Sequence, residues 1–493
     1  MSLVKKIIGQ SAIYFIGTIF SVLVGFFFKI YLSNKIGSEG LGLFTLGMSS
    51  VAIASIFLTF GYGNGLIRFV SKYLANKQYN RLSYYLKKTV FINILTLIPL
   101  SLIYFLFPDF VGEKLLNSKK LIEYIPLFGI VLIINSFLSI GDQTIRGFQE
   151  VKKSTIVHHF IRLPFKIILT VILFGLGMSL GGYLWAEIFA ALLSVILFVF
   201  ILKKLVPTSF SFINNKITKS NLEEKKYALN MFLIELLGVL QNHGEKIILV
   251  YFMSESELGV YSIILSIVAF IPTILVSVTS IFSPIVSAFH STNQLEKLSQ
   301  YYRYSVKYIF VLSFPLIAFI VLYNEIILQF FGEDFSVGYH LLWLVAIGEL
   351  INTSFGSVGT MLKMMGYDKM LRNISAITSI LTFFASFILI HYFGLVGVGI
   401  AYILKNISYN LGASIVLYKK SSINIFDFSY TKTIVLYFAL FGVLFSVYQP
   451  INVSILYLFL ELIIIYIVFI CFWTLLLGKK DYPIIIKLIK NDL

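Results

Sequence analysis

Long, uninterrupted apolar runs are the feature that most constrains this chain. The first lies between Lys6 and Asn34, and others of similar length follow at short intervals along the whole sequence. A helix needs about 20 apolar residues to cross roughly 30 Å of hydrocarbon, and only helices or closed barrels satisfy the backbone there. Because the runs lack the alternation of barrel strands, the sequence predicts an all-α integral membrane protein.

We expect about fourteen transmembrane helices. Their predicted ranges are 7–33, 41–66, 88–107, 121–143, 157–175, 181–202, 228–252, 258–282, 306–323, 338–362, 374–393, 395–418, 431–448 and 453–477. Two of the connections are short glycine-rich hairpins, at 175–182 and 394–399. Merging the runs on either side of a hairpin would give a segment too long for one span.

The charge distribution tests this count. A net charge of +16 would indicate nucleic acid in a soluble protein. Here 58% of the residues are hydrophobic, and the cations gather in short loops facing lipid headgroups. With a cytoplasmic N-terminus, 32 Lys and Arg fall on inner segments and four on outer ones, as the positive-inside rule expects. We therefore expect a multi-pass protein of a bacterial or other prokaryotic plasma membrane, with both termini cytoplasmic and no nucleic-acid partner.

The chain contains two copies of one unit. At an offset of 217 residues Leu41-Gly42-Leu43-Phe44 matches Leu258-Gly259-Val260-Tyr261, and Asn135 matches Asn352. The period holds six spans, so both copies begin on the same side of the membrane, and two such lobes enclose a central cleft. The predicted domains are a six-helix lobe at 1–203, a cytoplasmic linker at 204–227, a second six-helix lobe at 228–420, and two additional helices with a basic tail at 421–493.

Ionisable residues inside spans point to a lined cavity. Each costs about 2.5–3.5 kcal/mol at the centre of a membrane helix and usually faces a cavity. Spans one, four, seven and ten carry polar stripes at helical spacing, each ending in a cation. The stripes are Ser11, Tyr14, Thr18, Ser21, Gly25 and Lys29; Asn135, Ser139, Asp142 and Arg146; Glu235, Gly238, Asn242 and Lys246; and Glu349, Asn352, Gly356, Gly359 and Lys363.

These cations suit an anionic cargo. The candidate substrate-binding residues are Lys29, Lys246, Arg68, Arg146, Lys363 and the mid-span Lys405. The 217-residue offset pairs Lys29 with Lys246 at the outer level and Arg146 with Lys363 at the inner level. A phosphate could be handed from the inner pair to the outer one, because Arg offers a fork and Lys a point charge. Alternatively, the inner cations only set topology and the outer lysines snorkel to the interface.

The energy source is left open by the sequence. There is no phosphate-binding glycine loop, so we expect no nucleotide cofactor. Carboxylates in a cavity can bind H⁺ or Na⁺, and Asp142, Glu235 and Glu349 are the candidates. Glu245 beside Lys246 is a candidate ion pair that lowers the insertion cost. We expect Glu187 to form structural hydrogen bonds and the pair His158-His159 to lie on a cytoplasmic loop surface.

The span pattern and several motifs resemble the MOP exporter superfamily, and most closely its polysaccharide-exporter branch. The motifs are the turns at 38–44 and 255–261, the acidic-basic pair Glu245-Lys246, and Ile145-Arg146-Gly147-Phe148. The resemblance implies a V-shaped pair of lobes that alternates between inward- and outward-open states. It also implies an isoprenoid-pyrophosphate-linked oligosaccharide as cargo, moved outward for cell-surface polysaccharide assembly, with assembly proteins as partners.

Three other functions compete with this one. A MATE-like exporter of organic cations would need an acidic cleft, and the expected cleft is basic. A lipid II flippase is a closer rival because its cargo is also a pyrophosphate lipid, but basic residues early in the first span are missing. A membrane polymerase or ligase would need a large outer loop, and we find no nucleophile-base or metal set, so we predict a transporter without catalytic or metal-binding residues.

Overall fold

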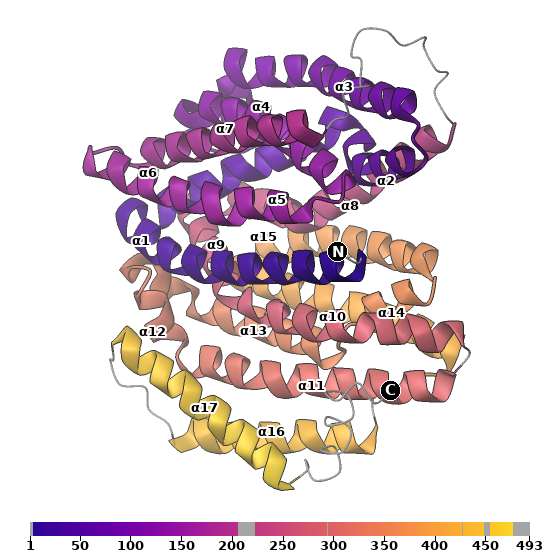
Figure 1. Ribbon diagram of the computed structural model, residues 1–493. Coiled ribbons are helices and arrows are strands. Elements are labelled where there is room, and N and C mark those ends of the chain that lie inside the picture. Colours follow the sequence, from indigo (N-terminus) through magenta and orange to yellow (C-terminus); the bar gives the residue numbers. More distant parts are fainter. Residues whose placement is uncertain (1–2, 206–221, 293, 426, 448–453, 477–493) are drawn as a thin grey trace. The chain divides into compact units, whose positions relative to one another are not determined.

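The computed structural model is helical throughout, with no strand in the residues it describes, which are 3–205, 222–292, 294–425, 427–447 and 454–476 (Figure 1). The chain forms two compact units, Met1–Ser262 and Ile263–Leu493. This division lies after the predicted linker, of which residues 206–221 fall outside the described residues. The predicted domain limits therefore stay a prediction.

The elements of the first unit are α1 (Leu3–Thr59), α2 (Tyr62–Ala75), α3 (Tyr79–Leu106), η1 (Phe110–Leu115), η2 (Ile122–Tyr124), α4 (Ile125–Gly147), α5 (Val151–Thr155), η3 (Ile156–Arg162), α6 (Leu163–Gly175), α7 (Leu180–Leu205), α8 (Leu222–Phe252) and the first part of α9 (Glu255–Val268). The second unit contains α10 (Phe270–Ser291), α11 (Leu295–Leu322), α12 (Asn324–Gln329), η4 (Glu333–Gly338), α13 (Tyr339–Ser354), α14 (Val358–Met364), α15 (Asp368–Ser421), α16 (Phe428–Val447) and α17 (Ile455–Leu476).

Glycines break the two longest helices. Gly37 in α1 has φ 68° and Gly394 in α15 has φ 56°, a backbone conformation that glycine adopts without steric cost. Each of these helices therefore holds two predicted spans. The break at Gly394 and the turn between α6 and α7, where Gly177 has φ 81°, confirm the two predicted hairpins.

The predicted end of the second span is wrong. It was expected to run from 41 to 66, but α1 ends at Thr59 and the chain turns at Phe60 and Gly61, both with positive φ. The next residues form the separate amphipathic helix α2, whose apolar side packs into the core of the first unit. An apolar run alone cannot reveal this turn, because α2 buries its apolar residues against protein instead of lipid.

The membrane character of the chain is confirmed. Eleven helical segments of the described residues are long and apolar enough to cross a membrane, and two of them contain the glycine breaks. The 31-residue α8 is not among the eleven, and it carries Glu235, Glu245 and Lys246 within its length. A total of about fourteen spans remains a prediction.

The matched glycines of the two sequence copies make a reciprocal contact inside the first unit. A Cβ on Gly42 would lie 1.7 Å from the backbone oxygen of Glu255, and one on Gly259 would lie 1.8 Å from that of Ser38. The contacted residues, Ser38 and Glu255, are also 217 residues apart. Each copy therefore makes the equivalent contact with the other. Ser38 Oγ also lies 2.6 Å from Ser256 Oγ. Glycine is needed at both positions because the backbones touch.

Candidate functional site

A polar pocket of about 510 Å³ lies inside the first unit. Its lining residues are Tyr14, Ser21, Arg146, His158, His159, Arg162, Leu163, Lys166 and Glu187. They come from α1, α4, η3, α6 and α7. We call this space the first-unit pocket.

The polar stripe of α1 forms one wall of this pocket. Gly17 gives η3 and α5 room to approach, since a Cβ there would lie 2.9 Å from the Thr155 methyl carbon. One turn further on, Ser21 Oγ lies 2.6 Å from His159 Nδ1, and Tyr14 packs edge-on to the same imidazole. The stripe therefore faces protein and pocket, as its spacing predicts. The side chain of Ser11, at its start, lies outside the described residues.

Asp142 organises the charged side chains on α4. Arg146 Nε lies 2.9 Å from Asp142 Oδ2 as an ion pair without hydrogen-bond geometry. His158 Nε2 lies 3.3 Å from Asp142 Oδ1, and the Ser154 hydroxyl donates to the same oxygen. Two of the predicted site residues, Asp142 and Arg146, are thus partners of each other.

Glu187 holds a second charged group together. Arg162 Nη2 lies 2.6 Å from Glu187 Oε1, and Lys166 Nζ lies 3.1 Å from Glu187 Oε2. The Glu187 side chain is 8% exposed, so this is a buried charge shared by two cations. Lys166 also reaches the Tyr183 hydroxyl at 3.5 Å and lies over its ring.

Lys29 extends this set of cations along α1. Its charge interacts with those of Lys166 and Lys246, so the two offset-matched lysines are close enough to act on one another. Like charges repel, and a cluster of lysines is easier to maintain when an anion lies among them. The repeat predicts that Lys29 and Lys246 occupy matching outer positions, and it gives no indication of Lys166.

The buried pair partner Glu187 gives a stability prediction. Replacing Glu187 by Gln keeps the shape but leaves Arg162 and Lys166 without their counter-charge. Removing one partner of a buried ion pair typically costs about 3–5 kcal/mol. We expect a lower Tm for E187Q in detergent. The matched control is E113Q, because Glu113 pairs with Lys119 at the surface and its side chain is 50% exposed. Equal Tm values for E187Q and wild type would contradict a structural role.

The second unit holds a separate buried network around Glu349. This carboxylate is 3% exposed and accepts hydrogen bonds from the Tyr402 hydroxyl and, at 3.2 Å, from Asn352 Nδ2. Asn410 Nδ2 donates to Asn352 Oδ1 at 3.3 Å. Lys405 Nζ lies 4.8 Å from the centre of the Tyr402 ring and acts on the Glu349 charge. Two more predicted residues, Glu349 and Lys405, are therefore brought together.

The remaining predicted residues have other surroundings. Arg68 Nη2 lies 3.1 Å from Glu223 Oε1, and Lys72 Nζ lies 2.7 Å from Glu223 Oε2. The hydrogen bond from Lys72 and the charge of Arg68 hold the pKa of the Glu223 carboxyl below its usual range. Arg68 is half exposed, which favours the interpretation that it sets topology. Lys363 is exposed at the end of α14.

Two carboxylates predicted to be functional lie on α8. Glu235 is half-buried. Glu245 is buried and accepts a hydrogen bond from the Tyr261 hydroxyl at 2.5 Å. The predicted ion pair between Glu245 and Lys246 stays a prediction. The side chain of Asn242, which belongs to the same stripe, lies outside the described residues.

Sequence reasoning missed four residues of the first-unit pocket, namely His158, His159, Arg162 and Lys166. The expectation that the histidines lie on a loop surface is wrong, because η3 continues into α6 and carries them into contact with Asp142 and Ser21. Glu187 was expected to form structural hydrogen bonds and does so with two cations. One sequence feature could have revealed part of this set. Arg162 and Lys166 are four residues apart, and this spacing places both side chains on one helix face.

The chemistry of the first-unit pocket favours anion binding. Arg146, Arg162 and Lys166 line the pocket beside the carboxylates Asp142 and Glu187, and the charge of Lys29 acts on that of Lys166. Arg and Lys in a partly buried site form the strongest hydrogen bonds to phosphate or carboxylate. The pocket is therefore suited to binding and passing on an anionic group.

Comparisons with known proteins agree with this picture. The family model of polysaccharide biosynthesis proteins matches residues 8–290, and the MatE family model matches residues 246–388. A curated relative, the probable low-salt glycan biosynthesis flippase Agl15 of Haloferax volcanii, is 21% identical over 391 residues, which is 78% of each chain.

Two solved structures have a similar fold. The lipid II flippase MurJ in an inward closed conformation gives a TM-score of 0.71 at 15% identity, covering 94% of this chain and 98% of that one. An inward-facing multidrug resistance MATE family transporter of the MOP superfamily gives a TM-score of 0.69 at 16% identity. The match covers 82% of this chain and 94% of that one. The predicted all-helical membrane fold is confirmed, whereas the V shape of the two lobes stays a prediction.

Proposed function

Because this chain belongs to the polysaccharide biosynthesis protein family of the MOP exporter superfamily, we propose that it is a flippase for an anionic, lipid-linked oligosaccharide. The proposed cargo is an isoprenoid-pyrophosphate-linked glycan, moved from the cytoplasmic to the outer face by alternating access. The observation that carries the proposal is the first-unit pocket with its neighbouring lysines. Arg146, Arg162 and Lys166 line this pocket within a membrane-spanning unit, where charged groups are costly, and the charge of Lys29 acts on that of Lys166.

The relatives narrow the class of cargo. Agl15 is described as a probable glycan biosynthesis flippase, and the matched family model is one of polysaccharide biosynthesis. An organic cation would be repelled by the cations of the first-unit pocket, which disfavours the drug-exporter alternative. The lipid II flippase alternative rests on the likeness to MurJ over nearly the whole chain. The oligosaccharide lipid and lipid II both present a pyrophosphate, so the pocket could bind the headgroup of either one. Only the glycan part distinguishes these two cargoes.

We also propose that the flux is coupled to H⁺ or Na⁺ through a buried carboxylate. Glu349 suits this role best among the three candidates. It is buried, its hydrogen bonds come from a neutral hydroxyl and a neutral amide, and Lys405 is near. Asp142 is already engaged by Arg146 and His158. A carboxylate with neutral donors can gain or lose a proton without breaking an ion pair.

A reconstituted assay tests the proposal. Purified protein is placed in liposomes with a fluorescent undecaprenyl-pyrophosphate oligosaccharide, and the labelled lipid reaching the opposite leaflet is measured by quenching. We expect flipping that accelerates under an imposed H⁺ or Na⁺ gradient, and loss of that acceleration in E349Q. Transport of lipid II but not of the oligosaccharide lipid would favour the MurJ-like function. Transport of a small organic cation instead would overturn the proposal.

A further inference from the structure

Asp142 on α4 is held by different partners on its two oxygens. The Ser154 hydroxyl of α5 donates to Asp142 Oδ1, and His158 Nε2 of η3 lies 3.3 Å from the same oxygen. Arg146 Nε lies 2.9 Å from the other oxygen, Oδ2. The carboxylate therefore stays anchored to α5 and η3 even when its contact with Arg146 is given up.

The contact with Arg146 is the less directed of these attachments. Arg146 Nε is buried and has no hydrogen-bond partner, so the pair is held by charge and not by the parallel hydrogen bonds of an Arg–carboxylate fork. The Arg146 side chain is 31% exposed, against 14% for Asp142, and it lines the first-unit pocket. An anion in this pocket would therefore meet the guanidinium and not the carboxylate.

Glu187, the other carboxylate of this pocket, is bound differently. Arg162 Nη2 donates to Glu187 Oε1 at 2.6 Å, and Lys166 Nζ lies 3.1 Å from Oε2. Both oxygens thus have a cation within hydrogen-bond distance, and the side chain is 8% exposed. Giving up either contact would leave a buried cation without its counter-charge, which is strongly unfavourable. Of the two carboxylates, Asp142 is the one whose cation can be exchanged.

The repeat indicates that this counter-charge belongs to the first unit alone. The 217-residue offset places Lys363 at the position of Arg146, so the cation is present in both copies. It places Gly359 at the position of Asp142, so the carboxylate is present in one. A carboxylate that only lowered the cost of inserting the cation would be equally useful in both copies. The role of Asp142 is therefore sought in the first-unit pocket.

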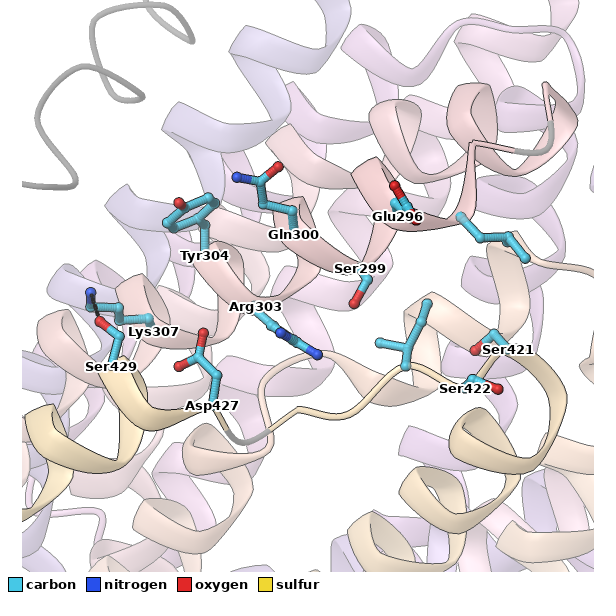
Figure 2. A pocket seen from close by; sticks show the side chains of 12 residues that line it. Glu296, Ser299, Gln300, Arg303, Tyr304, Lys307, Ser421, Ser422, Asp427 and Ser429 are labelled. Atoms are coloured by element: carbon cyan, nitrogen blue, oxygen red, sulfur yellow. Dashed lines mark hydrogen bonds between the residues drawn. The ribbon is translucent and has the colours of Figure 1, made fainter.

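The charges of a cavity in the second unit are tied to the backbone instead. This cavity, of about 630 Å³, lies between α11 and the turn before α16 (Figure 2), and we call it the second-unit cavity. Arg303 Nε donates to the Asn424 backbone carbonyl at 2.8 Å. Asp427 Oδ1 accepts from the Tyr430 backbone N–H at 2.7 Å and so caps α16. The second-unit cavity thus supplies a control for the binding experiments below.

We propose that Asp142 is an internal counter-ion of Arg146 that the anionic group of the cargo displaces. In the empty pocket the carboxylate compensates the guanidinium. An entering phosphate accepts two parallel hydrogen bonds from the Arg146 fork, and Asp142 stays behind on Ser154 and His158. When the cargo leaves, the pair forms again, so the empty transporter carries no uncompensated cation in a span. Asp142 is a positioning residue, and the exchange rests on the function proposed above for the first-unit pocket.

Titration of inorganic pyrophosphate into the full-length protein in a neutral detergent, followed by calorimetry, tests the exchange. D142N should bind pyrophosphate about tenfold more tightly than wild type, because an opposite charge at this distance shifts the equilibria of its partner by that factor or more. S154A should bind it less tightly, because Asp142 loses a donor and competes more strongly for Arg146. The matched control is D109N, which removes an exposed carboxylate between α3 and η1 and should bind as wild type.

A double-variant cycle identifies the cation concerned. D142N should leave the pyrophosphate affinity unchanged in an R146Q background, because its effect acts through Arg146. R303Q removes a cation from the second-unit cavity and should bind as wild type. Equal tightening by D142N with and without Arg146 would show a general effect of net charge and overturn the exchange. Loss of binding in R303Q but not in R146Q would place the anion in the second-unit cavity and overturn it as well.

Transport separates this role from a merely structural one. In proteoliposomes D142N should reach half its maximal flipping rate at about tenfold less labelled lipid, and its maximal rate should fall because the cargo leaves more slowly. A structural role would lower Tm and leave the half-saturating concentration unchanged.

Two results would overturn the exchange outright. They are an absence of pyrophosphate binding by wild type, and wild-type affinity in a folded D142N protein. If D142N does not fold, wild-type affinity in S154A decides in the same way. Pyrophosphate binding with the expected variant effects, but no flipping of the labelled lipid by wild type, would instead overturn the proposed function and leave the exchange standing.

Discussion

Replacement of Lys29 and Lys246 together by alanine is expected to abolish flipping. The two lysines come from α1 and α8, and the charge of one acts on the other across the first unit. Each charge-assisted hydrogen bond to a phosphate is worth about 1.5–3 kcal/mol. Losing two of them should reduce the rate at least about a hundredfold, since each 1.4 kcal/mol is a factor of ten. Quenching of a labelled lipid in proteoliposomes measures this rate.

The double variant needs a control of equal charge change. K114A with K35A removes two lysines that were predicted to lie in outer loops, so the net charge falls by the same amount. We expect near-normal flipping in the control. The Tm of K29A/K246A in detergent is measured beside that of wild type, so that loss of flipping can be distinguished from loss of folding. Normal flipping by a well-folded K29A/K246A protein would refute the cationic site.

The sequence predicts most of the fold because its signals are local. Apolar length determines which segments span the membrane, and glycine determines where a helix can turn, as at Gly394. The offset of 217 residues adds one long-range relation, which matches Lys29 to Lys246, and the charges of these two lysines act on one another. The misplaced end of the second span shows the limit, because α2 is apolar on one face only and packs on protein.

The site was less predictable because its contacts join distant segments. Glu187 meets Arg162 and Lys166 only after α6 and α7 have packed against each other, and no spacing in the sequence records that contact. The positive-inside rule counts cations near span ends as topology signals, and so it cannot distinguish them from cations with buried partners. The His158 contact with Asp142 depends on the π-helical turn η3, which shifts the register of the following helix.

Substitution of Gly259 by alanine should open the reciprocal contact between the two copies. A Cβ at that position would lie 1.8 Å from the Ser38 backbone oxygen, and a backbone atom cannot rotate away as a side chain can. Alanine normally favours a helix over glycine by about 1 kcal/mol, so any loss caused by G259A must come from the contact itself. The same reasoning applies to Gly42, where the clash with Glu255 is equally close.

A cysteine pair reports whether this contact is made. Ser38 Oγ and Ser256 Oγ lie 2.6 Å apart, so cysteine sulfurs at these positions would be within reach of one another, and the single native Cys471 can be replaced by serine. The S38C/S256C pair should cross-link in wild-type background and in the control G442A, whose added methyl meets open space. It should fail to cross-link in G259A. If alternating access requires the contact to break, the cross-link should stop flipping and a reductant should restore it, whereas undiminished flipping by the oxidised protein would show that this contact does not open during transport.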